Sequence, residues 1–145
     1  MSRGSPPGSR LPDRKRGSMA IKVLHVDRDY VEIPLVQGST ARVVVWPGMG
    51  ASKSCIHYVP YEAGQSSVPH QHPYSEDSFY IVHGEGHMVE YKDDKEVGRQ
   101  PIGPGSVVFV EPGTVHQLVA TTPLLNVGGP CPPDLEFYQR WGLTW

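Results

Sequence analysis

The chain has 145 residues, with 13 Lys and Arg against 15 Asp and Glu, so its formal charge is −2. This length suits one domain, and this balance gives no reason to expect nucleic acid or an anionic membrane as a partner. No run of residues approaches the roughly 18 to 20 apolar residues of a membrane span. Two cysteines are too few for a disulfide framework, so we expect a cytoplasmic protein.

The beginning of the chain differs in composition from the rest. Met1 to Ser18 contain five of the 13 basic residues, several Gly, Pro and Ser, and almost no apolar side chain. Such a segment cannot bury enough apolar surface to fold, so we expect a disordered basic tail over 1–18 and a single domain over 19–145. A nucleic-acid-binding arm is the alternative, but no aromatic side chain is interleaved with these charges.

From Ala20 onward, short β-prone runs alternate with turns. The predicted strands are Ile21 to Val26, Ala41 to Trp46, Ser54 to Val59, Val68 to His72, Ser78 to His83, His87 to Tyr91, Ser106 to Val110, Gln117 to Ala120 and Leu124 to Val127. Turn signals rich in Gly, Pro and Asp separate them. Only Asp134 to Trp141 has a pattern that suits a helix. Many short strands at regular spacing are typical of an all-β sandwich or jelly roll.

Three histidines and an acidic pair form the clearest chemical pattern. His70 and His72 are two residues apart on an expected strand, so their imidazoles point to one face. Glu76 and Asp77 follow after a short turn, and His116 follows a Pro-Gly turn further along the chain. Imidazole and carboxylate suit Fe, Mn, Ni, Co or Zn, and an octahedral ion would keep two positions open. We therefore predict one divalent transition-metal ion as the cofactor.

These residues resemble the two motifs of the cupin family, G-x5-H-x-H-x3/4-E-x6-G and G-x5-P-x-G-x2-H-x3-N. The first motif reads here as Gly64-QSSVP-His70-Gln71-His72-PYSE-Asp77-SFYIVH-Gly84. The second reads as Gly105-SVVFV-Glu111-Pro112-Gly113-TV-His116-QLV-Ala120. Asp stands where the family usually has Glu in the first motif, and Glu and Ala replace the first Pro and the final Asn of the second. The order of the motifs and their glycines make the resemblance specific over about 64–120.

The resemblance implies an all-β, double-stranded β-helix (jelly-roll) cupin barrel whose metal is held by one acid and by His70, His72 and His116. Six residues separate Asp77 from Gly84, which is the family spacing, whereas Glu76 would need seven. Adjacent side chains on a strand point to opposite faces, so only one acid should enter the barrel. We favour Asp77, and Glu76 remains the alternative because a local bulge could turn it inward.

The same resemblance implies a metal-dependent enzyme that acts on a small organic molecule. Oxygenase-type chemistry, as in the dioxygenases of the family, is the first choice, which would make the protein an oxidoreductase. A non-redox isomerase, decarboxylase, cyclase or lyase is the main alternative, with His57 as a candidate catalytic proton carrier one strand before the motif. A cupin that binds a small molecule without turnover is the alternative from another class.

We also expect a homodimer. Cupins of this size commonly pair through an edge strand, and an uncovered edge invites pairing between copies. Apolar segments lie at both ends of the expected barrel, at Ala41 to Trp46 and at Leu135 to Trp145. The expected partners are therefore a small-molecule substrate and a second copy of the chain, with no nucleic acid and no membrane.

Overall fold

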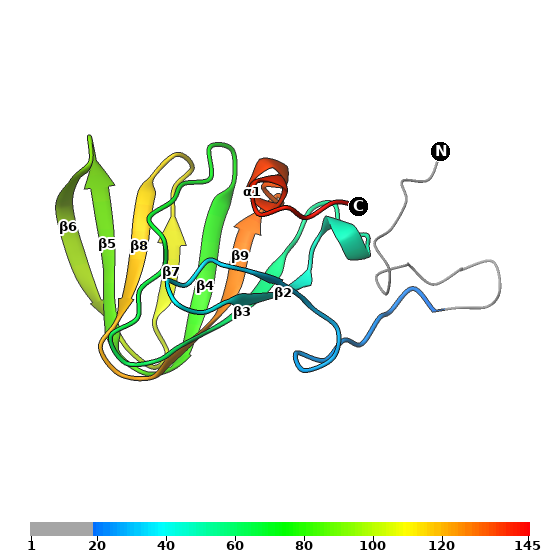
Figure 1. The fold of residues 1–145 in the computed structure, drawn as a ribbon, viewed down its shortest axis with the longest axis horizontal. Helices are drawn as coiled ribbons and strands as arrows, with labels where there is room; N and C mark the ends of the chain where they lie inside the picture. The colour runs from blue at the N-terminus through cyan, green and yellow to red at the C-terminus, as the bar shows by residue number, and fades with distance from the viewer. Residues whose placement is uncertain (1–18) are drawn as a thin grey trace.

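The structure is a computed structural model that describes residues 19–145, so the tail expected over 1–18 lies outside the described residues (Figure 1). Strands make up most of the regular secondary structure of the described chain, with a short 3-10 helix, η2, and one α-helix, α1. The elements are β1 (Val31–Ile33), β2 (Ala41–Val45), η2 (Pro47–Met49), β3 (Ile56–Tyr61), β4 (Glu76–His83), β5 (Gly86–Lys92), β6 (Lys95–Ile102), β7 (Val107–Val110), β8 (Val115–Ala120), β9 (Leu124–Cys131) and α1 (Leu135–Arg140). This confirms the predicted all-β class and the predicted C-terminal helix.

Two antiparallel sheets form the barrel. The larger has the strand order β1-β2-β3-β9-β4-β7, and the smaller has the order β6-β5-β8. The segment before β4 extends the smaller sheet, because Ser66 bridges to Val119 and His70 bridges to His116. The barrel is therefore closed beside β8. On its other side, the free edges of β6 and β7 border a groove of about 690 Å³.

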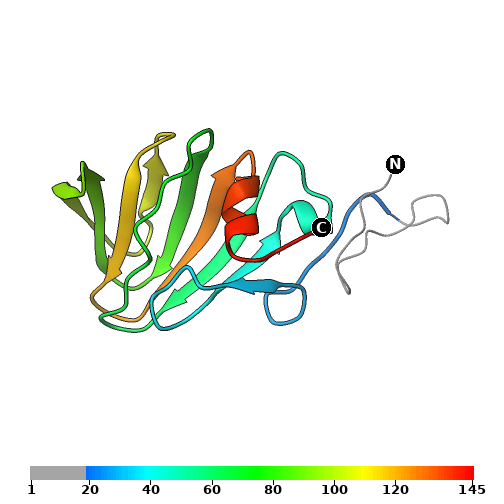
Figure 2. The same ribbon diagram turned by 45° about the horizontal axis from the view of Figure 1, so that its top comes forward.

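The core lies between the two sheets and is closed at one end by α1, which lies beside β9 in both views (Figures 1 and 2). The predicted alternation from Ser54 to Val59 is confirmed, since Cys55, His57 and Val59 are all buried. Helix α1 adds two buried aromatic side chains, Phe137 and Tyr138, to the core. Among residues 19–145, no helix is long and apolar enough to cross a membrane.

Two strand predictions were wrong or incomplete, and two strands, β1 and β6, were not predicted. Ile21–Val26 forms no strand, because this exposed segment pairs with no neighbour. Val68–His72 contributes only the bridge at His70, since the flanking Pro69 and Pro73 cannot donate to a ladder. Strand β6 was missed because nearly all of its side chains are exposed, so its sequence has no apolar period, although it pairs with β5 along its length.

Candidate metal centre

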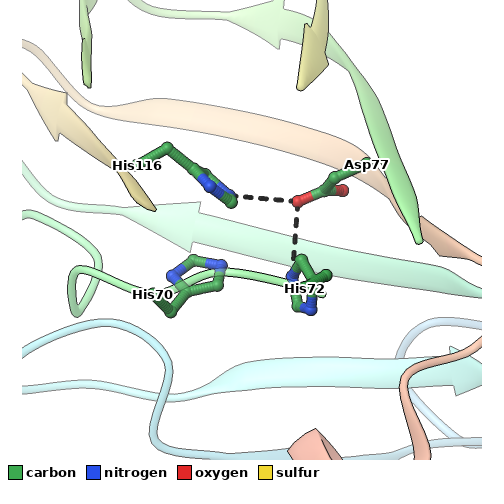
Figure 3. Close-up of side chains that lie close together, drawn as sticks. All are labelled: His70, His72, Asp77 and His116. Carbon is green, nitrogen blue, oxygen red and sulfur yellow. Dashed lines mark hydrogen bonds and ion pairs between the residues drawn. The ribbon is translucent and has the colours of Figure 1, made fainter. Parts of the chain in front are cut away.

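Four side chains from three segments of the chain meet inside the barrel at one end of β8: His70, His72, Asp77 and His116 (Figure 3). Asp77 lies on β4 and His116 on β8, while His70 and His72 lie on the segment before β4. The backbones of His70 and His116 exchange two hydrogen bonds, with N···O distances of 3.1 and 2.9 Å. One nitrogen or oxygen atom from each of the four residues lies within 4.8 Å of all the others.

Backbone carbonyls orient two of the three imidazoles. His70 Nδ1 lies 2.6 Å from the carbonyl oxygen of Val68, and His116 Nδ1 lies 2.8 Å from that of Thr114. A carbonyl can only accept, so in both rings Nδ1 carries the proton and donates it. The neutral ring then has a free lone pair on Nε2, which is the form that binds metals.

A carboxylate orients the third imidazole. Asp134 Oδ2 accepts a hydrogen bond from His72 Nδ1 at 2.9 Å, so His72 also keeps its Nε2 free. The other oxygen of Asp134 accepts from the backbone N–H of Phe137 at 3.3 Å and caps the N-terminus of α1. The sequence analysis missed Asp134, because a residue 62 positions from His72 gives no local signal of this contact.

The two adjacent acids face opposite sides of β4. The Asp77 side chain is buried with the histidines, and its Oδ2 lies 3.2 Å from His116 Nε2 and 3.5 Å from His72 Nε2 (Figure 3). Glu76 is exposed. The strand period places only one acid inside the barrel, and that acid is the one with the family spacing to Gly84.

Burial and the neighbouring charges set the protonation of the site. Burial, together with the two neighbouring imidazoles, lowers the pKa of His70 to about 3, so this ring is neutral near pH 7. Burial opposes ionisation of Asp77, but hydrogen bonds with His116 and His72 hold the pKa of that carboxyl well below its usual range. Burial also disfavours charge on His72, but the two carboxylates Asp77 and Asp134 outweigh it and raise the His72 pKa.

His57, the candidate proton carrier, lines the same cavity as the four residues. The cavity has a volume of about 30 Å³, and Phe137 packs within it, with ring centroids 4.8 Å from His72 and 6.5 Å from His57. Nε2 of His57 forms a hydrogen bond of 2.8 Å with the hydroxyl of Tyr138. Burial lowers the pKa of His57 to about 4, so this ring is also neutral near pH 7.

Comparison with known proteins identifies the family. The Cupin domain family model matches residues 57–125, which span the whole group of four side chains. The chain is a small cupin-domain protein. No curated protein matches its sequence. The prediction of a cupin from the two histidine motifs is therefore confirmed.

Many solved structures share the fold. Ectoine synthase from P. lautus has a TM-score of 0.63 and 18% identity, covering 84% of this chain and 87% of that chain. The polyketide cyclase RemF from Streptomyces resistomycificus has a TM-score of 0.58 and 20% identity, covering 83% and 93%. An RmlC-like cupin from Shewanella frigidimarina has a TM-score of 0.58 and 15% identity, covering 83% and 96%. Similarity at this identity shows the fold, and it confirms the double-stranded β-helix.

Proposed function

We propose that this cupin binds one divalent transition-metal ion through His70, His72, Asp77 and His116 and uses it for oxygenase-type chemistry on a small organic molecule. The observation that carries the proposal is a set of acceptors that face one another. Each Nδ1 proton is donated outward, so the Nε2 atoms of His116 and His72 converge on Asp77 Oδ2 at 3.2 and 3.5 Å, and without an ion they must share protons with that carboxylate. Facing acceptors repel unless a proton or a cation lies between them.

The geometry and charge of the group fit a transition metal. Two ligands bound at about 2.1 Å to one ion lie at most about 4.2 Å apart. The four atoms here lie within 4.8 Å of one another, so they need to move together by only about half an ångström. Three neutral nitrogens and one carboxylate favour Fe, Mn, Ni, Co or Zn over Ca or Mg, which prefer oxygen. Such an ion would polarise a substrate oxygen and, if it is iron, activate dioxygen.

The size of the cavity limits what can enter it. About 30 Å³ accommodates one or two molecules the size of water, so it suits dioxygen or one functional group of a substrate. Met88 and His116 line both this cavity and the groove of about 690 Å³ between β6 and β7. We infer that the body of the substrate lies in that groove, and that the buried Phe137 and the partly buried Met88 in the cavity wall limit the access of water to the metal.

A non-redox reaction is the second candidate, and His57 favours it. This neutral imidazole lies in the cavity wall with the Tyr138 hydroxyl 2.8 Å away, so the pair could hold or pass one proton. Two of the similar structures are named as a synthase and a cyclase. Both candidates use the same four side chains for the metal. Both cysteines are free thiols, which suits the reducing cytoplasm in which we propose that the protein acts.

Reconstitution with single metals tests the proposal. Metal-free protein is loaded with Fe(II), Mn(II), Ni(II), Co(II) or Zn(II), incubated with a fractionated small-molecule extract, and followed by an oxygen electrode and mass spectrometry. We expect oxygen uptake that requires Fe(II) and is lost in Asp77→Asn but kept in the matched control Glu76→Gln. Turnover without oxygen uptake that His57→Gln abolishes would support the second candidate. A compound that binds and leaves unchanged with every metal would contradict both.

A further inference from the structure

The row of side chains that contains His116 continues beyond the metal centre. Strand β5 lies between β8 and β6 in the smaller sheet (Figure 1). On β5, Glu90 is paired with His116 of β8 and with Gly98 of β6. Directly opposite residues of antiparallel strands point to one face of the sheet, with Cα atoms about 5 Å apart. Because His116 points into the barrel, Glu90 also points inward, one strand away from the metal centre.

Met88 supports this orientation of Glu90. It lies two residues before Glu90 on β5, and alternate residues of a strand share a face. Met88 lines the metal cavity and is paired with the buried Leu118 of β8, so this face of β5 is the inner one. Both Met88 and Glu90 also line the groove between β6 and β7. One inner wall therefore runs from the metal centre past Met88 to the carboxylate of Glu90.

The space beside Glu90 is open. Gly98, the residue opposite it on β6, has no side chain, and a Cβ atom placed there would meet no other atom within 4 Å. The Glu90 side chain is exposed, and none of the ion pairs among residues 19–145 includes it. A carboxylate that faces a groove without a cationic partner on the described chain can bind a cation from outside.

The charges along the groove have the same sign as Glu90. Arg99 lines the groove, but its guanidinium group donates two hydrogen bonds of 2.8 Å to the carboxylate of Glu96. Glu111 also lines the groove and is exposed. The groove is therefore acidic, whereas a divalent ion held by one carboxylate carries a net positive charge. The two ends attract chemical groups of opposite charge.

We propose that Glu90 determines substrate specificity by binding an ammonium group, or another cationic group, of a small molecule whose oxygen-bearing end reaches the metal. The substrate class is then a compact zwitterion or amine in which a few bonds separate the two groups. A hydroxyl group would bind Glu90 more weakly, because an ion pair adds charge attraction to the hydrogen bond. This inference rests on the proposed function, since the metal binds the other end of the substrate.

Binding of three hydroxamates to the Zn(II)-loaded, full-length protein tests this inference. The three compounds share the metal-binding end and a short alkyl chain, and they end in a methyl, an ammonium or a carboxylate group. By isothermal titration calorimetry, we expect the ammonium compound to bind about 5- to 10-fold more tightly than the methyl compound. Glu90→Gln should remove this preference, and Glu90→Lys should make the carboxylate compound the tightest of the three.

The matched control is Glu85→Gln, because Glu85 is exposed, precedes β5 and lies outside the groove lining. It should keep the preference for the ammonium compound. The metal content and the melting transition are measured for each protein, and both should match the wild type. Equal binding of the ammonium and methyl compounds by the metal-loaded wild type, or a loss that Glu85→Gln shares, would overturn this inference alone. A wild type that takes up no metal would overturn the proposed function and this inference with it.

Discussion

The Asp134→Asn substitution tests whether the hydrogen bond from His72 to Asp134 keeps His72 in the form that binds a metal. In Asp134→Asn the side chain keeps one carbonyl oxygen, which can still cap α1, because Asn and Asp are equally good N-cap residues. The second oxygen, 2.9 Å from His72 Nδ1, becomes an amide nitrogen that donates. Two donors then face each other, so the ring must rotate or move its proton to Nε2, which removes the metal-binding lone pair. We expect the metal affinity to fall by about 10- to 100-fold.

The assay is competition with a chromogenic chelator for Zn(II) and Co(II), run beside thermal unfolding of the metal-free protein. Glu136→Gln is the matched control, because it removes one negative charge from the first turn of the same helix at an exposed position. The control should leave the affinity within about twofold, since a surface charge is screened. Metal affinity that Asp134→Asn leaves unchanged, or that both variants lower equally, would refute this role for the hydrogen bond.

Three further predictions concern the acid, the pH and the tail. Asp77→Asn should lower metal affinity at least about 10-fold and Glu76→Gln should not, in the same competition assay; the reverse result would place the ligand one residue earlier. His57 titrates near pH 4 when folded but near 6.5 when unfolded, so the unfolded chain binds the extra proton. The metal-free protein should therefore lose about 3 kcal/mol of unfolding free energy through this residue as the pH falls from 6.5 to 4. In urea titrations, His57→Gln should remove this loss. An unfolding free energy that falls equally with pH in the two proteins would contradict this. A chain that begins at Met19 should melt within about 2 °C of the full chain, and a fall of several degrees would mean that residues 1–18 pack on the barrel.

Local sequence patterns predicted the parts of the structure that depend on strand period. The alternation around His57 and the two-residue spacing of His70 and His72 place side chains on one face whatever the strand pairs with. The family motifs then predicted which strands come together. The two-residue period of the strands and the spacing of the family motifs together led to the predicted metal site, and the structure groups the same four side chains.

Contacts between distant segments could not be predicted in this way. The hydrogen bond that His72 donates to Asp134 depends on where α1 docks, and the edge-on contact of Phe137 with His72 depends on the same packing. Strand β6 is stabilised by its ladder with β5 rather than by burial, so its composition gave no signal. The place of Glu90 in one row with His116 becomes visible only when the pairing of β5 with β8 is known.

The metal content of the protein tests the central claim most directly. The full-length chain is purified without chelators, incubated with a slight excess of each first-row divalent metal, desalted and analysed by inductively coupled plasma mass spectrometry. The account predicts about one bound equivalent of transition metal per chain and loss of most of it in His72→Ala. A folded wild-type chain that retains less than about 0.1 equivalent of every metal would contradict the account.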